Sequence, residues 1–433
     1  MNAWGSGADH LSDSGEEARA AAELPAPAGH PRFPLMDPLR AIAAILVMLV
    51  HVAIFSGGFA AWPKWALAHF DIGVAFFFLL SGFLLYRPML ASRVSGLPAQ
   101  RLRDYTRNRF FRIFPLYWTV LVVSAIVPGM YGAFTGNWWV YFGLLMDFPL
   151  FTPEGKCATD PFHCAIPPAW TLAIEVFFYI LLPFFAMAMA WATRSLKKHE
   201  PKRFFTGWVR IELVVLGLLA LVSFWIQGQT DRSGFNQWLI FSPLGRAWWF
   251  GLGMALAVFS VRTAQLNREI FPVRFARRHA GSCWLAAIAA YLICTYLILE
   301  PSPSLAGPAT GMGEYLFQYF AFGLIALLVL APAVFGQIDR GLPNRILGHP
   351  ALIRLGLISY GIFLWHFPVL MVLNDLELTS KVPGAQFPVL AVGTFLITVL
   401  LSAATYLTVE KPLMRWSRQF SKPAGGHGRR DEA

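Results

Sequence analysis

Long apolar runs separated by shorter polar segments make up most of the chain from residue 38 onward. Runs of this length predict membrane-spanning helices, because about 20 helical residues cross the hydrocarbon core of a bilayer. Ten spans are predicted, near residues 38–58, 71–91, 112–132, 169–191, 210–228, 238–260, 281–299, 313–334, 352–373 and 387–408. The pattern therefore predicts an all-α polytopic membrane protein.

The segments outside these spans have a different character. Residues 1–33 are rich in Ala, Gly, Ser, Pro and acidic residues and lack a basic stretch leading into a short apolar one, so they predict a disordered tail and not a signal peptide. Residues 34–412 form one integral-membrane domain, and 413–433 form a polar, basic tail. Residues 137–151 are apolar and aromatic but short, which favours an interfacial or re-entrant segment.

The composition supports a membrane protein, since 56% of the residues are hydrophobic and only 14% are charged. A soluble domain carries about 25% charged residues. The net charge of +11 would suggest a nucleic-acid partner in a soluble protein, but here we interpret it as a topology signal and expect no nucleic acid.

The distribution of Lys and Arg orients the predicted spans. With the N-terminus inside, the loops on the outer side hold only Lys64, Lys156, Arg232 and Lys381, and Arg246 falls within a span. All other basic residues lie on the inner side, as cytoplasmic loops require. Both termini are therefore predicted to be cytoplasmic, with the protein in the plasma (inner) membrane.

The four cysteines fall into two pairs. Cys283 and Cys294 lie in one apolar run and are predicted to be packing residues. Cys157 and Cys164 share a polar loop predicted to face the outside, where a disulfide can form. No Cys-x-x-Cys spacing occurs, so we expect no metal site.

Arg40 and His51 stand eleven positions apart in the first span. Eleven helical residues turn about 1100°, which is about 20° from three full turns, and rise about 16 Å. The two side chains thus share a face, with the arginine at the cytoplasmic rim and the histidine past the middle of the membrane. They suit a long ligand with an anionic head and a reactive tail, or else an interface anchor and a packing histidine.

Five arginines lead into the third span, within residues 101–118. Arg109 and Arg112 are three positions apart and so lie on one helical face. Paired guanidinium groups suit phosphate recognition through bidentate hydrogen bonds. The alternative is ordinary positive charge on the cytoplasmic side.

Four further polar residues lie within apolar runs, where ionisable groups are costly and indicate function. Ser81 lies mid-helix among aromatic residues and is predicted to line a pocket or to allow close packing. Glu175 needs an Arg or His partner or water in a cavity, and an ion pair with Arg246, which enters the membrane from the same side, is the structural alternative. His366 lies toward the outer half of its span, as a packing histidine or a substrate contact.

Six motifs occur in one order along the chain: MDPLRAIAAILVMLVH, FFFLLSGFLL, RNRFFRIFPLYW, AWTLAIEVFFYILLP, ISYGIFLWHFPV and VEKPLMR. Together they resemble the bacterial type-3 membrane acyltransferases, which O-acylate sugars, lipids and natural products. The resemblance covers about residues 36–412. Ala75 stands where the family often has an acidic residue, and Thr171 replaces its usual serine.

The resemblance implies that an acyl group, with acetyl the default, passes from cytoplasmic acyl-coenzyme A (acyl-CoA) to a hydroxyl at or beyond the outer face. The acceptor would be a carbohydrate, a lipid or a natural product, and no permanently bound cofactor is expected. Arg40, Arg109 and Arg112 would then hold the coenzyme A head group.

The same resemblance suggests roles for the buried residues. His51 would act as the general base or would be transiently acylated, and Glu175 would orient the acceptor or a histidine. Ser81, Arg246 and His366 would contact substrate.

Two other classes of function remain open at this point. A transporter or flippase for a lipid-linked sugar would also need about ten helices and buried polar residues, but not a cytoplasmic phosphate site. A structural scaffold would tolerate the loss of His51. Turnover of acyl-CoA distinguishes an enzyme from both.

Overall fold

The computed structural model describes residues 33–56, 67, 69–95, 100–134, 137–146, 164–195, 201–229, 234–266, 268–297, 311–336, 341–376 and 384–420. Most of the predicted N-terminal tail, the last thirteen residues of the C-terminal tail, and Cys157 therefore lie outside the described residues. Cys164 is disulfide-bonded, and Cys283 and Cys294 are free and buried, as expected for packing residues.

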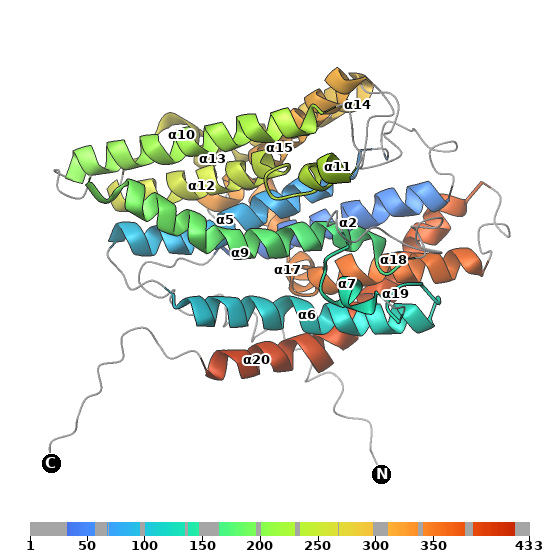
Figure 1. Ribbon diagram of the computed structural model, residues 1–433. Helices are drawn as coiled ribbons and strands as arrows, with labels where there is room; N and C mark the ends of the chain where they lie inside the picture. Colours follow the sequence, from blue (N-terminus) through green and yellow to red (C-terminus); the bar gives the residue numbers. More distant parts are fainter. Residues whose placement is uncertain are drawn as a thin grey trace, which may run out of the picture.

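The described residues form helices, with no strand among them (Figure 1). The first half of the chain contains α2 (Met36–Phe55), α5 (Ile72–Ser95), α6 (Leu102–Ile126), α7 (Trp138–Phe142), η2 (Pro167–Ala169), α9 (Trp170–Ala192) and α10 (Pro201–Gln227). The second half contains α11 (Gly234–Ile240), α12 (Ala247–Leu266), α13 (Phe271–Arg278), α14 (Ala280–Leu297), α15 (Met312–Phe335), α16 (Leu342–Leu347), α17 (Pro350–Leu357), α18 (Ser359–Asp375), α19 (Gln386–Thr405), η4 (Tyr406–Glu410) and α20 (Lys411–Gln419). The all-α prediction is confirmed.

Nine helical segments in the described part of the chain are long and apolar enough to cross a membrane. The pair α17 and α18 makes a tenth span if it is taken as one, although its two parts are bent by 71°. The predicted number of spans is therefore confirmed at nine to ten.

Two predicted segments differ in detail. The span expected at 238–260 is divided, because α11 ends at Ile240 and α12 begins only at Ala247. Within 137–146, only the five residues of α7 are helical, which is too short to cross a bilayer.

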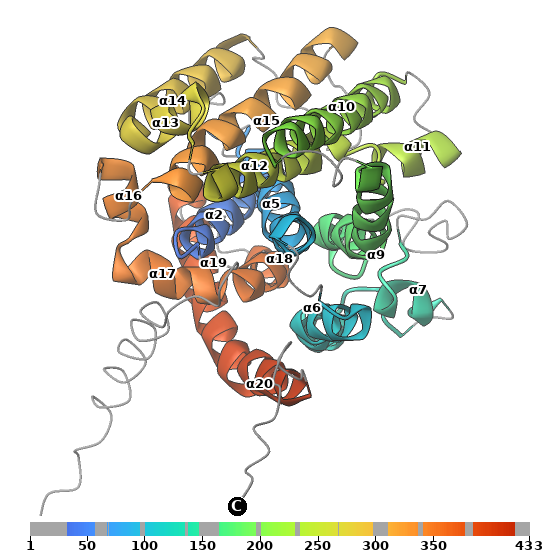
Figure 2. The same ribbon diagram turned by 90° about the vertical axis from the view of Figure 1, so that its left-hand side faces the viewer.

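Helix α5 occupies the middle of the bundle, with α2 and α12 directly beside it (Figure 2). In its apolar stretch 78% of the residues are buried. Two glycines make the contact with α12 close, since a methyl group on Gly82 would overlap the Phe250 main chain and one on Gly253 the Leu79 main chain. The central helix thus carries Ser81 into the interior, one position before Gly82.

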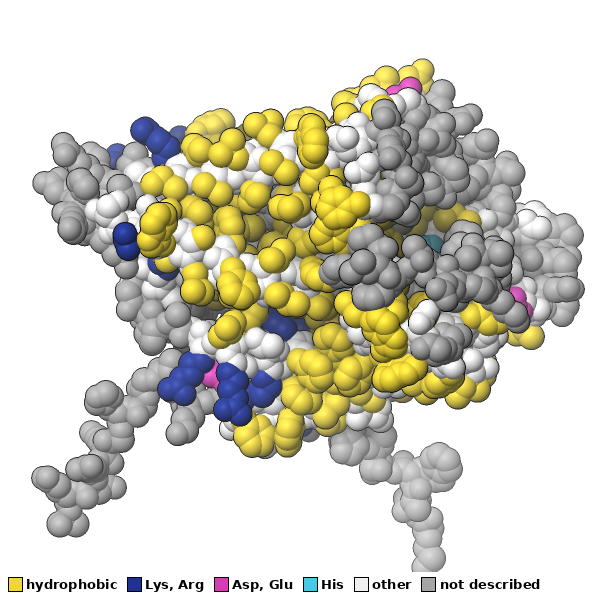
Figure 3. All heavy atoms as spheres, viewed as in Figure 1, with side chains coloured by type: hydrophobic (Ala, Val, Ile, Leu, Met, Phe, Trp, Pro, Cys, Tyr) yellow, Lys and Arg dark blue, Asp and Glu magenta, His cyan; other side chains and the backbone are white. Residues whose placement is uncertain are grey.

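The visible Lys and Arg side chains gather toward one end of the bundle, on the left of Figure 3. Helix α20 packs there against the first half of α6, where Ser417 Oγ donates to Asn108 Oδ1 at 2.9 Å. The assignment of this end to the cytoplasm stays a prediction. The gathering of Lys and Arg at one end of the bundle agrees with the positive-inside rule.

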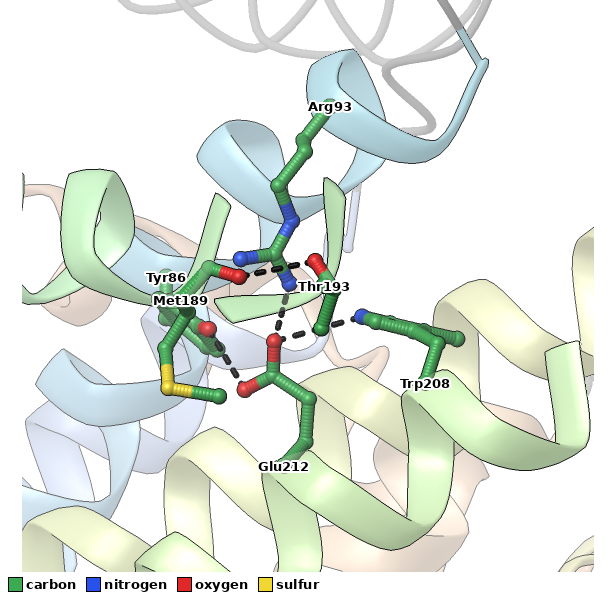
Figure 4. Close-up of polar contacts among 6 residues, drawn as sticks. All are labelled: Tyr86, Arg93, Met189, Thr193, Trp208 and Glu212. Atoms are coloured by element: carbon green, nitrogen blue, oxygen red, sulfur yellow. Dashed lines mark hydrogen bonds and ion pairs between the residues drawn. The ribbon is translucent and has the colours of Figure 1, made fainter. Parts of the chain in front are cut away.

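A buried ionic cluster joins α5 to α10 (Figure 4). Glu212 is fully buried and accepts hydrogen bonds from Arg93, from the Tyr86 hydroxyl at 2.7 Å and from Trp208 Nε1 at 3.2 Å. A buried carboxylate is costly unless it is paired in this way. The cluster therefore fixes α10 against the central helix.

Candidate functional site

Four of the predicted site residues line one pocket. Arg40 reaches it from α2, Ser81 from α5, Arg112 from α6 and Glu175 from α9. The pocket holds about 660 Å³ of space free of atoms, part of it open to the surroundings. Its other lining residues are Phe77, Phe78, Ile113, Thr171, Leu172, Tyr179, Ser359, Tyr360 and Phe363.

Glu175 provides the carboxyl group of this pocket. Ser81 Oγ donates to Glu175 Oε1 at 2.5 Å, and the Tyr179 hydroxyl donates to the same oxygen. Tyr179 stands one helical turn after Glu175 and so lies on the same face. The suggested ion pair between Glu175 and Arg246 was wrong, since none joins them in the described structure.

The pocket also holds two guanidinium groups in different situations. Arg40 Nη1 forms an ion pair with Asp37 Oδ1 at 2.8 Å. Arg112 forms no ion pair with any residue that the structure describes. Of the two, Arg112 is therefore the one that no described carboxylate holds at ion-pair distance, and the nearby Glu410 interacts with it electrostatically.

Arg109 does not line the pocket but lies directly behind its wall. Its guanidinium carbon is 5.7 Å from the ring centroids of both Tyr105 and Tyr179. Cation–π contacts of this kind hold the arginine against the ring that donates to Glu175. Of the predicted pair, Arg112 thus lines the pocket, and Arg109 contacts the ring of Tyr179, which lines it.

His51 forms a pair with His366 instead of lining this pocket. His51 Nδ1 lies 3.3 Å from His366 Nε2, and the ring centroids are 5.2 Å apart. His366 is fully buried, whereas His51 is partly exposed. The structure therefore brings together two histidines that are far apart in the sequence.

Phe363 stands between the pocket and the histidine pair. It lines the pocket, and its ring centroid lies 5.9 Å from that of His366. Because α2 is continuous from Arg40 to His51, those two residues are about 16 Å apart along its axis. The site thus has two polar parts, joined along α2 and α18 and separated by an aromatic ring.

Arg246 lies apart from both, inside a group of aromatic rings. Its guanidinium carbon is 5.2–5.8 Å from the ring centroids of Trp170, Phe241, Trp249 and Tyr319. Such contacts stabilise a cation that is only 3% exposed. Trp170 begins α9, the helix that also carries Glu175.

Sequence reasoning did not assign roles to two tyrosines of the pocket. Tyr179 could have been found from its spacing of four positions after Glu175. Tyr360 donates from its hydroxyl to the Ile113 carbonyl oxygen at 2.9 Å and so ties α18 to α6. Only the tertiary structure reveals that second contact.

The chain matches the family model described as "Acyltransferase domain" over residues 34–407. The chain belongs to this family. The predicted family and the predicted enzyme class, an acyltransferase, are thereby confirmed.

Several curated relatives share this region. The chain is 23% identical to the O-acetyltransferase OatA of Staphylococcus aureus over 89% of its own length and 58% of the relative's. It is 24% identical to the peptidoglycan O-acetyltransferase OatA of Listeria monocytogenes, over 88% of its own length and 56% of the relative's. It is 26% identical to YrhL of Bacillus subtilis, over 91% and 57%. The chain thus spans a little under three fifths of their length, and no solved structure matches it.

Proposed function

We propose that this acyltransferase moves an acyl group, with acetyl the default, from cytoplasmic acyl-CoA to a hydroxyl of an envelope carbohydrate, glycolipid or secondary metabolite. The observation that carries the proposal is the pocket that gathers Arg40, Ser81, Arg112 and Glu175 from four helices. Partly buried ionisable side chains that converge on one cavity within the membrane indicate a substrate site.

The donor fits the basic side of this pocket. Arg112 has no ion pair among the described residues, and a guanidinium group binds phosphate oxygens bidentately. Arg109 supports the same wall through Tyr179. An anionic head group held near Arg112 and Arg40 would leave its acyl end directed along α2 toward His51.

The reaction requires one proton transfer. On this proposal His51 removes the proton of the acceptor hydroxyl, and the oxygen attacks the thioester carbonyl carbon. The carbon–sulfur bond then breaks, and the thiolate takes the proton back from the imidazolium, which gives the ester and the free thiol. General-base catalysis by histidine suits neutral pH. An acyl group carried transiently by His51 is the alternative course.

The names of the relatives favour one class of acceptor over the others. The name of the Listeria monocytogenes protein assigns it peptidoglycan as its substrate, which is a carbohydrate polymer of the envelope. We therefore rank an envelope carbohydrate first among the acceptors. Transport of a lipid-linked sugar is not named for either OatA relative.

The experiment is transfer of label from radiolabelled acetyl-CoA by the purified full chain, with glycan and lipid extracts of its host as acceptors. Wild type, His51→Ala and Arg112→Ala are compared. Arg262→Ala is the matched control, because Arg262 belongs to α12 and does not line the pocket. Label should enter an extract with wild type and the control and should be lost with His51→Ala. Arg112→Ala should raise KM for the donor.

The outcomes separate the components of the proposal. A folded wild type that neither binds nor turns over acetyl-CoA would overturn the donor assignment and leave sugar transport to be tested. Equal transfer by wild type and His51→Ala would remove His51 as the base. Label found only in the lipid extract would replace the carbohydrate with a lipid acceptor.

A further inference from the structure

The hydrogen atoms of the two histidines are fixed by the backbone oxygens beside them. His51 Nδ1 lies 2.7 Å from the Val47 carbonyl oxygen, and His366 Nδ1 lies 3.2 Å from that of Ile362. A carbonyl oxygen can only accept, so each Nδ1 carries the hydrogen. In a neutral imidazole the other nitrogen, Nε2, is then the unprotonated one.

This assignment gives the contact between the rings a direction. His366 Nε2 is an acceptor, and it lies 3.3 Å from the Nδ1–H of His51. The hydrogen on His51 Nδ1 is thus shared between a carbonyl oxygen and a second imidazole. His51 Nε2 makes no hydrogen bond to a described residue, which leaves its lone pair open to a proton.

The packing around the pair keeps both rings in this arrangement. Phe367 meets His51 edge-on, with ring centroids 5.4 Å apart, and the ring centroid of Phe363 lies 5.9 Å from that of His366. His366 is 0% exposed, so a substrate cannot contact it without moving these rings. Contact of His366 with substrate, one of the two roles that the sequence left open, would require these rings to move.

We infer that His366 is a positioning residue, which holds His51 in the tautomer whose Nε2 accepts the proton of the acceptor hydroxyl. The inference rests on the proposed function. When Nε2 takes that proton, His51 becomes an imidazolium and its Nδ1–H becomes a stronger donor toward His366 Nε2. The neutral ring of His366 thus stabilises the charge that forms during the reaction and gives up no proton itself.

The test compares kcat and KM of full-length variants in detergent, with acetyl-CoA and the acceptor fraction that wild type labels. His366→Leu removes the acceptor nitrogen and keeps an apolar side chain of similar size. We expect kcat to fall roughly 10- to 100-fold, as for the loss of a hydrogen bond to a charged group, with KM for both substrates unchanged. His366→Gln places an amide oxygen near the former Nε2 and should restore most of kcat.

A matched control lies one position away on α18. Trp365 Nε1 donates to Thr405 Oγ1 at 3.3 Å, so Trp365→Phe also removes one interhelical hydrogen bond but does not touch His51. This variant should keep the wild-type kcat. If His366→Leu does not fold, His366→Gln is compared with His366→Asn, whose shorter amide falls near Nδ1 and should not restore kcat.

Three results would overturn the inference. These are an unchanged kcat in His366→Leu, an equal loss in Trp365→Phe, and a rise in KM for the acceptor at constant kcat. The last result would return His366 to substrate binding. Failure of wild type to use acetyl-CoA at all is a separate result, and it would concern the proposed function.

Discussion

The hydroxyl groups that surround Glu175 allow a quantitative prediction about its charge. Ser81 and Tyr179 both donate to Glu175 Oε1. A hydrogen bond to a charged group contributes about 1.5–3 kcal/mol, whereas one between neutral groups contributes about 0.5–1.5 kcal/mol. Ser81→Ala should therefore lower the free energy of unfolding by about 1.5–3 kcal/mol if Glu175 is ionised.

Ser81→Ala should lower the free energy of unfolding by less when residue 175 carries no charge. In the Glu175→Gln background the amide oxygen still accepts from Ser81, but only as a neutral group. Ser81→Ala should then lower the free energy of unfolding by about 0.5–1.5 kcal/mol. The difference between the two backgrounds is the coupling energy between the hydroxyl and the charge.

The assay is reversible unfolding in mixed detergent micelles, followed by circular dichroism, for the four members of this cycle. Ser124→Ala is the control, because Ser124 Oγ is buried on α6 and has no hydrogen-bond partner among the described residues, so its removal should change the free energy of unfolding little. Equal losses for Ser81→Ala in both backgrounds would refute the reasoning. Glu175 would then be a neutral acid that Ser81 merely contacts.

Three further predictions concern the helix contacts and the aromatic partition. Gly253→Ala should lower the free energy of unfolding by about 1–3 kcal/mol, because the added methyl group would overlap the Leu79 main chain. Gly217→Ala is its control and should not lower the free energy of unfolding, because no described atom lies within 4 Å of a methyl group there. Glu212→Leu should lower the free energy of unfolding by about 3–5 kcal/mol, because it leaves the largely buried Arg93 without its partner. The double variant Glu212→Leu, Arg93→Leu should recover much of that loss. Phe363→Ala should open the pocket toward the histidines and raise acceptor-independent release of coenzyme A several-fold, and an unchanged rate would show that this ring is no barrier.

The helices could be predicted from the sequence because their signal is local. Apolar runs of span length gave α2, α5, α9, α14, α15 and α19 to within a few residues. The start of α6 was missed by ten residues, since its first turns are charged and carry no apolar signal. The 71° bend between α17 and α18 was also missed, because residues 352–373 read as one apolar run. Gly356 instead allows α17 to pack closely against α2, since a methyl group there would overlap the Asp37 main chain.

The site could be predicted as a set of residue types but not as a set of partners. An ionisable side chain in an apolar run is conspicuous in any sequence, which is how Glu175, Arg246 and His366 were found. Their partners depend on the rotation of each helix about its axis, which a span prediction leaves free. An ion pair between Glu175 and Arg246 was suggested. In the structure, two hydroxyl groups donate to Glu175, and Arg246 lies among aromatic rings.

The arrangement of these partners has a consequence for the order of binding. Arg112 and the histidine pair lie in different parts of the site, with Phe363 between them. If the donor binds on the side of Arg112 and the acceptor on the side of His51, each substrate enters from its own end of the bundle. The thioester carbon then meets the acceptor hydroxyl only where the two parts join, beside Phe363. Such a partition keeps water at one end from the thioester at the other, and it requires that both substrates be bound together before transfer. A ternary complex is thus the kinetic course that this geometry favours over an acyl-enzyme released from its donor before the acceptor arrives, and initial rates with both substrates varied distinguish the two.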